Sequence, residues 1–268
     1  MALALMTLVA LGACSPAVTL DGQRMPRPQG AQHTHVAPDT RLSGWHFMSR
    51  ATQALQDDDT QNPAFLWVQE GQRRFEAQCA SCHAESGRGE GPALRDVATR
   101  YPAFDTAAAK PFTLAQRIRH CHSQRVSSAS SSLDDEALLA LESHLAHAAR
   151  GLPIAPPSDP RLAPWLEQGR QLWQQRLGQI DLSCSDCHDR LAGRRLGGST
   201  IPQAHPTGYP VYRLEWQGLG NLQRRLRGCL VGVRAEPFAP DAPEWVALEL
   251  YLKQRAAGMI TDAPAVRP

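Results

Sequence analysis

The sequence is poor in lysine, in net charge and in long apolar runs. Lys110 and Lys253 are the only lysines among 28 basic residues, and the formal net charge is +2. So small a net charge gives no broad positive field, which argues against a nucleic-acid-binding protein. The apolar run at residues 1–14 is too short to span a membrane. The basic side chains are therefore almost all arginine, whose planar fork suits haem propionates and oxyanions.

Ligand pairs at zinc-finger spacing are also missing, so two Cys-x-x-Cys-His pentapeptides need another explanation. This pattern is the attachment signature of c-type haem: both thiols add across the haem vinyl groups, and the histidine takes one axial position on the iron. A thioredoxin-like dithiol would not need the trailing histidine. We predict two covalent haems, bound by Cys79 and Cys82 and by Cys184 and Cys187, with His83 and His188 as iron ligands.

The N-terminal residues are typical of export. Residues 1–14 form an apolar leader, and Leu11–Cys14 resembles a bacterial lipobox in which Cys14 is lipidated; an ordinary cleaved signal peptide is the alternative. Either form predicts a periplasmic protein, tethered to the membrane if Cys14 carries a lipid. Residues 15–55 are predicted to be an irregular linker or a strap on the first domain. The first part of this range is rich in Pro, Gly, Gln and His and has no apolar periodicity.

The chain contains an internal duplication. Tyr101–Phe104 matches Tyr209–Tyr212, and Leu114–Cys121 matches Leu222–Cys229, both with an offset of 108 residues. The haem motifs are offset by 105 residues. A repeated unit of this size predicts one domain that has been copied, with a small insertion after the second haem motif.

Each copy has a helical plan with few strand signals. A helix leads into the haem motif, a second ends near a further cysteine, and an amphipathic helix closes the unit, so the fold class is mainly α with two tandem cytochrome c-like domains. The predicted closing helices are 133–149 and 243–256, and the predicted domains are 56–152 and 153–262, divided by a proline-rich stretch.

No methionine lies between a haem motif and the closing helix of its repeat, which excludes the commonest distal ligand of an electron carrier. Each repeat instead has one spare cysteine, Cys121 or Cys229, one helical turn after Arg117 or Arg225. An arginine on the same helix face favours the thiolate, which is the form that binds iron. The alternatives are a Cys121–Cys229 disulfide, inert thiols, or ligation by His120, His122 or His205.

The segments His205–Leu214, Leu222–Cys229 and Val233–Pro237 together resemble the A subunit of the SoxAX cytochrome of the sulfur-oxidising Sox pathway. The resemblance covers residues 60–258. It implies an L-cysteine S-thiosulfotransferase that joins thiosulfate to a cysteine of a SoxYZ carrier protein. Two electrons would leave through haem to a cytochrome c, and a small monohaem SoxX-like subunit would be the partner.

The same resemblance implies roles for single residues. Cys229 would ligate the active-site haem and carry a persulfide, and Arg225 would bind the substrate. The first haem, with His83 and Cys121 on its iron, would relay or store electrons or be a structural remnant. A thiosulfate dehydrogenase that forms tetrathionate, or a simple dihaem electron carrier, are the other functions that the motifs allow. A dihaem peroxidase is disfavoured because each iron already has a candidate sixth ligand.

Overall fold

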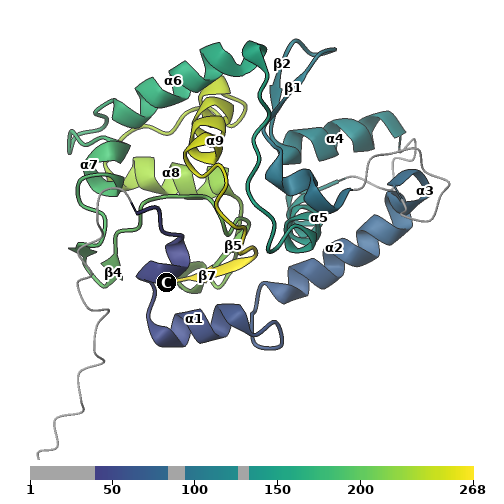
Figure 1. Ribbon diagram of the computed structural model, residues 1–268, viewed down its shortest axis with the longest axis horizontal. Helices are drawn as coiled ribbons and strands as arrows, with labels where there is room; N and C mark the ends of the chain where they lie inside the picture. The colour runs from purple at the N-terminus through teal and green to yellow at the C-terminus, as the bar shows by residue number, and fades with distance from the viewer. Residues whose placement is uncertain (1–39, 84–93, 126–132) are drawn as a thin grey trace, which may run out of the picture.

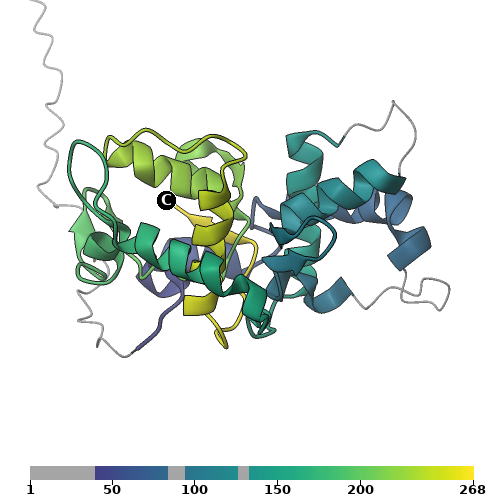
Figure 2. The ribbon, with the colours of Figure 1, turned by 90° about the horizontal axis from the view of Figure 1, so that it is seen from above.

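The computed structural model describes residues 40–83, 94–125 and 133–268, and these form two helix-rich halves side by side (Figure 1, Figure 2). The mainly α character predicted from the sequence is confirmed, since the strands are only two or three residues long. Among the described residues, no helix combines the length and apolar content needed to cross a membrane. The leader and Cys14 lie outside the described residues.

The elements fall into three groups along the chain. A 3-10 helix η1 (Gly44–Phe47) and α1 (Arg50–Asp57) come first. The first half contains α2 (Phe65–Gln78), α3 (Ala80–His83), η2 (Leu94–Thr99), β1 (Ala103–Asp105), β2 (Lys110–Phe112), α4 (Leu114–Arg125) and α5 (Asp135–Ala148). The second half contains η3 (Pro160–Leu162), α6 (Ala163–Gln174), α7 (Cys184–His188), β3 (Arg195–Leu196), β4 (Ser199–Thr200), β5 (Val211–Arg213), η4 (Leu214–Trp216), β6 (Gly218–Gly220), α8 (Leu222–Gly232), α9 (Pro243–Arg255) and β7 (Ala265–Arg267).

Both halves are built on the same helix crossing. Helix α2 packs across α5, and α6 packs across α9. At the crossings, a Cβ atom on Gly71 would lie 2.0 Å from the Ala140 carbonyl oxygen, and one on Gly169 would lie 2.2 Å from the Ala247 carbonyl oxygen. Only glycine permits so close an approach. The predicted closing helices are confirmed as α5 and α9, and each packs on the helix that precedes a haem motif.

A short antiparallel hairpin follows in each half, with the same register. Ala103 lies opposite Phe112 in the β1–β2 pair, and Val211 lies opposite Gly220 in the β5–β6 pair. The second half adds β7, which pairs in parallel with β5. Because each hairpin leads directly into the helix with the spare cysteine, α4 or α8, it fixes where that helix starts.

The segment before α2 lies on the second half, which differs from the expected strap on the first domain. Arg41 donates to the Ala257 carbonyl oxygen at 2.8 Å, and the Leu42 amide donates to Gln203 Oε1 at 2.7 Å. Gln56 on α1 accepts a hydrogen bond from the Val266 amide of β7 at 3.3 Å. From residue 40 onward the expected linker is thus a helical strap that closes the C-terminal half.

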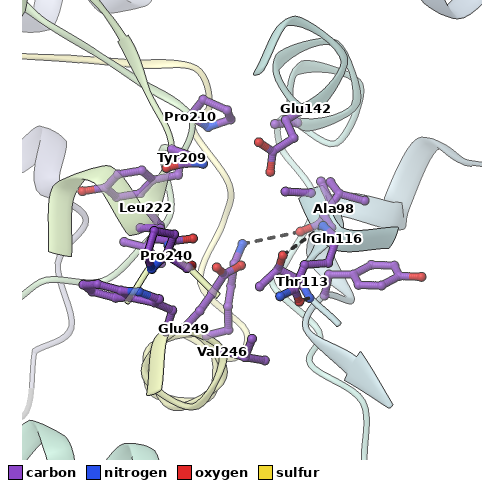
Figure 3. Close-up of a pocket in the computed structure, with 18 of the residues that line it drawn as sticks. Ala98, Thr113, Gln116, Glu142, Tyr209, Pro210, Leu222, Pro240, Val246 and Glu249 are labelled. Carbon is purple, nitrogen blue, oxygen red and sulfur yellow. Dashed lines mark hydrogen bonds between the residues drawn. The ribbon is translucent and has the colours of Figure 1, made fainter. Parts of the chain in front are cut away.

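A cavity of about 60 Å³ separates the two halves. Glu142 of α5 and Glu249 of α9 occupy equivalent places in the duplication, and both carboxyl groups point into this space (Figure 3). Burial raises the pKa of Glu142 to about 8, helped by the charge of Glu249, and raises the pKa of Glu249 to about 7. Lys253 reaches across the boundary to the Ala98 carbonyl oxygen at 3.4 Å. None of the predicted haem ligands lines this cavity.

Candidate active site

The second Cys-x-x-Cys-His motif forms the short helix α7, and a capping box fixes its start. The Ser183 hydroxyl accepts a hydrogen bond from the Asp186 amide at 3.1 Å, and the Asp186 carboxylate accepts one from the Ser183 amide at 2.9 Å. These reciprocal bonds satisfy amides that the start of a helix leaves without partners. Arg176 and Arg190 lie 3.0 and 2.8 Å from the same carboxylate. The haem motif therefore begins from a firmly held turn.

The His188 imidazole is oriented so that its Nε2 atom is left for a metal. Its Nδ1 lies 2.7 Å from the Pro202 carbonyl oxygen, which can only accept, so Nδ1 carries the proton. Burial lowers the pKa of His188, although the bond to Pro202 opposes the shift, and the ring is neutral. A neutral imidazole whose other nitrogen donates to a carbonyl is the usual form of a histidine metal ligand.

The side chains of Trp173, Asp189 and Arg255 form a wall that supports this histidine. Trp173 stacks on the His188 ring, with centroids 5.8 Å apart and 30° between the planes. The Trp173 indole donates to Asp189 at 2.8 Å, and Arg255 donates to the same carboxylate at 2.7 Å while lying 4.5 Å from the Trp173 ring centroid. Each member of the wall holds another, so the ring plane of His188 is fixed.

Cys229 lies on α8, within the range at which its charge acts on both cysteines of the second motif. Burial raises the pKa of Cys184 to about 11, and the nearby Cys229 adds to the rise. Burial also raises the pKa of Cys187, with further contributions from Asp186 and Cys229. All three thiols are free. The structure thus gathers the cysteines predicted for the second haem around one space.

Arg225 belongs to the same cluster. Burial alone would lower the pKa of its guanidinium, but the neighbouring Cys229, followed by Tyr209 and Glu215, raises it above its usual value. The helix that presents Arg225 and Cys229 starts at Asn221, whose side chain accepts a hydrogen bond from the Arg224 amide at 2.9 Å. The structure therefore brings the predicted substrate-binding and catalytic residues together.

The residues of the second half fit a covalent haem. Two free thiols lie on one helical turn, a neutral histidine has its Nε2 available, and a third sulfur lies close to both thiols. A thiolate at that third position would complete a histidine–sulfur ligand pair on an iron.

The first half has the equivalent cysteines and histidine, and two of these cysteines are more exposed to solvent. Burial raises the pKa of Cys79 to about 11, with contributions from Cys121 and Cys82, so the spare cysteine again lies near the haem motif. Cys82 and Cys121 are exposed, however. Among the described residues, His83 Nδ1 has no hydrogen-bond partner. The predicted ligands of the first haem are brought together, with less support around them.

The structure bears on the alternatives to thiolate ligation of the iron. Cys121 and Cys229 are both free, which contradicts a disulfide between them. His120 packs edge-on against Phe112, with ring centroids 5.6 Å apart. His122 Nε2 and His205 Nδ1 are buried and lack partners among the described residues, so both histidines keep a nitrogen for another role.

Two supporting groups were not predicted from the sequence. The Pro202 carbonyl acts through the backbone, which leaves no signal in the residue type. Trp173 could have been found from the duplication, because it stands 98 residues after Phe75, the same offset that relates Gly169 to Gly71. Only alignment of the helix crossings, rather than of the haem motifs, reveals that match.

Comparison with known proteins finds similarity over both halves of the chain. The family model described as "SoxA/TsdA, cytochrome c domain" matches residues 65–154 and 168–261. The chain is similar to the "L-cysteine S-thiosulfotransferase subunit SoxA" of Pseudaminobacter salicylatoxidans, with 31% identity over 85% of this chain and 82% of the relative. The protein of the same name from Rhodovulum sulfidophilum is 32% identical over 85% of this chain and 81% of its own length.

A solved structure has the same fold. It is described as "Crystal structure of SoxXA from P. pantotrophus", and it superposes with a TM-score of 0.77 at 29% sequence identity. The match covers 86% of this chain and 88% of the solved chain, so both halves are included.

Proposed function

This chain belongs to the SoxA/TsdA cytochrome c family, and we propose that it is the SoxA-type subunit of an L-cysteine S-thiosulfotransferase. It joins thiosulfate to a cysteine of a SoxYZ-type carrier protein. The observation that carries this conclusion is the cluster in the second half, where Arg225 and Cys229 lie beside the Cys184–His188 haem motif. Arg225 supplies a cation that can bind an oxyanion, and Cys229 supplies a sulfur for sulfur transfer. Both lie beside a haem attachment motif.

The overall reaction forms one sulfur–sulfur bond between two reduced sulfurs. The outer sulfur of thiosulfate bonds to the carrier cysteine sulfur, the thiol proton passes to solvent, and two electrons pass to a c-type cytochrome acceptor. The haem, when bound, supplies an iron that takes up electrons one at a time, while the protein orients the reactants and sets the charge around them. The site residues therefore have to bind a dianion and hold its outer sulfur in place.

Arg225 binds the sulfonate oxygens of thiosulfate, since a guanidinium offers two parallel N–H donors to an oxyanion. Cys229 lies one helical turn further along α8 and, together with His188, would hold the iron of the haem. The resemblance to the family implies a persulfide on Cys229. Its outer sulfur and the outer sulfur of thiosulfate form a new sulfur–sulfur bond, and the two electrons released pass to the c-type cytochrome acceptor. The carrier thiolate then attacks the sulfur that came from thiosulfate, takes the thiosulfate group and leaves the Cys229 persulfide behind, which is thiol–disulfide exchange in character.

The remaining assignments follow the same reasoning. We assign a second haem to the first half, on Cys79 and Cys82 with His83 and Cys121 on its iron, as an electron relay, an electron store or a structural remnant. The partner is a small SoxX-like monohaem cytochrome, as in the complex named in the solved structure. The protein works in the periplasm, and a lipid on Cys14 would tether it there. The mass of the intact mature chain tests haem number and lipid together.

The experiment uses the purified holoprotein with its small cytochrome subunit, a SoxYZ-type carrier, thiosulfate and oxidised cytochrome c. We expect the carrier mass to rise by one thiosulfate as two equivalents of cytochrome c are reduced. Tetrathionate formation without any carrier would instead assign the protein as a thiosulfate dehydrogenase. Cytochrome c reduction without a sulfur product would leave it a simple electron carrier.

A further inference from the structure

The two halves differ at one position beside the arginine that precedes the spare cysteine. Asp105 ends strand β1 and Arg213 ends strand β5. These residues are related by the same 108-residue offset as Arg117 and Arg225. The duplication has therefore replaced an acid by a base next to equivalent arginines.

In the first half, Asp105 forms an ion pair with the arginine, Arg117. Asp105 is 8% exposed and pairs with Arg117, and it also accepts a hydrogen bond from the Ala108 amide at 2.6 Å. The Arg117 guanidinium lies 5.3 Å from the Phe112 ring centroid. Burial lowers the pKa of Arg117, but Asp105 and Tyr101 together outweigh burial and the net shift is upward. The charge of Arg117 is thus already balanced within the protein.

In the second half, the replacement leaves positive charge in excess. The Arg213 side chain is only 12% exposed, lies 5.4 Å from the Trp216 ring centroid and pairs with Glu215 at 3.0 Å. Burial and the neighbouring Arg225 lower the pKa of Arg213, although Glu215 opposes the shift. Glu215 also lies near Arg225, and it is 56% exposed to water. Glu215 therefore pairs directly with Arg213 and acts on Arg225 only at longer range.

Arg213 and Arg225 occupy the places of Asp105 and Arg117, which pair directly in the first half, so their two positive charges lie near each other and an anion between them would be stabilised. The forks of Arg213 and Arg225 offer parallel N–H donors to such an anion. A dianion such as thiosulfate is attracted by the two guanidinium groups about twice as strongly as a monoanion at the same place, and a neutral sulfur compound gains no such attraction. The Trp216 ring and the Glu215 carboxylate hold Arg213 in place before any ligand arrives.

We propose that Arg213 is the second arginine of the thiosulfate site and that its replacement of an aspartate confines substrate binding to the second half. This inference rests on the proposed function, because it places a second donor on the same substrate. Arg213 holds the sulfonate end together with Arg225, and the outer sulfur is left facing Cys229. In the first half, the Asp105–Arg117 pair occupies the equivalent place and no anion is needed.

The test compares the holoprotein complex with its Arg213→Gln, Arg213→Lys and Arg213→Asp variants. We expect Arg213→Gln to weaken thiosulfate binding, measured by calorimetry without turnover, and to raise KM by roughly 10- to 100-fold, as for loss of one charge-assisted contact. Arg213→Lys should recover part of this loss. Arg213→Asp should have the largest effect, because it recreates the ion pair of the first half around Arg225. The matched control is Arg227→Gln, which removes an exposed charge from the same helix.

The reduction potential and absorbance of the second haem are measured on every variant. Weaker thiosulfate binding with an unchanged potential supports the proposal. Unchanged thiosulfate binding with a shifted potential would place Arg213 on the carboxylates of the haem and overturn it. A wild-type complex that forms no carrier adduct would overturn the proposed function as well, whereas an active wild type with an unaffected Arg213→Gln variant overturns this inference alone.

Discussion

In the first half, Arg117 pairs with Asp105 and packs on Phe112, whereas in the second half Arg225 faces Cys229 and a second arginine, Arg213. The backbone around them is the same in both copies: a hairpin, then a helix with a cysteine one turn after the arginine. The comparison teaches that the copied scaffold positions the parts, while the partner of one guanidinium decides whether the site can take an anion.

The surroundings of the two haem motifs point the same way. His188 is locked by the Pro202 carbonyl and the Trp173 ring, and its motif starts at a capping box. Among the described residues, His83 has no partner for Nδ1, and Cys121 is exposed. Chemistry that needs fixed geometry is better supported in the second half.

Substitution of the spare cysteines should give the largest difference in activity between the two halves. Cys229→Met should reduce carrier conjugation by roughly 10³-fold or more, because it removes the sulfur that receives the substrate. It should also shift the spectrum of the second haem. Cys121→Met is the matched variant and should leave turnover within a few-fold of wild type. Equal losses in both variants, measured with the carrier assay, would contradict the division of labour.

Substitution of the paired arginines should have the next largest effect. Arg225→Ala should lower kcat/KM for thiosulfate by roughly 100-fold, as expected for loss of a charge-assisted bond to the substrate, with both haems retained. Arg117→Ala should leave kcat/KM nearly unchanged and instead lower the melting temperature, because Asp105 loses its partner. Thiosulfate kinetics and thermal unfolding of the two variants separate these outcomes, and full activity of Arg225→Ala would remove it from the site.

The carboxylates between the halves should have the smallest and most gradual effect. The pKa values of Glu142 and Glu249 are raised to about 8 and about 7 from an ordinary value of 4.5. The folded chain therefore holds protons that the unfolded chain has lost, so stability is greatest at low pH and falls as the pH rises through 8. The folding equilibrium constant should fall by up to about tenfold per pH unit for each such proton.

Urea unfolding of the holoprotein between pH 5 and 9 measures this slope. Glu142→Gln should flatten it, because the amide never ionises beside Glu249, Lys253 and Arg119. Glu136→Gln is the matched control, since Glu136 is exposed at the start of the same helix. A slope that is identical in wild type and Glu142→Gln would mean that Glu142 is ionised throughout.

Much of the scaffold was predictable because it follows from periodicity and repetition. The closing helices expected at 133–149 and 243–256 are Asp135–Ala148 and Pro243–Arg255, since Asp134 caps the first and Pro243 starts the second. The strap from residue 40 was not predictable, because its hydrogen bonds join residues about 200 positions apart and depend on the finished second half.

The positions of the candidate ligands could be predicted from the sequence, but the balance of charge around them could not. The cysteines, the histidines and the place of Arg225 one turn before Cys229 follow from motif spacing, whereas the substrate role of Arg225 follows from the family resemblance. The exchange of Asp105 for Arg213 is visible when the repeats are aligned, but only the structure shows that Asp105 pairs with Arg117. Ion pairs between separate elements leave no periodic signal in a sequence, and the same holds for the carbonyl of Pro202.

The most direct measurement is peptide mass spectrometry of the holoprotein after incubation with thiosulfate and oxidised cytochrome c in the absence of carrier. Sulfur acquired from the substrate should appear on the peptide that contains Cys229, and the peptide that contains Cys121 should keep the mass of its unmodified sequence. Added sulfur on Cys121 alone, or on neither peptide while the carrier assay remains active, would show that the reaction centre is not in the second half.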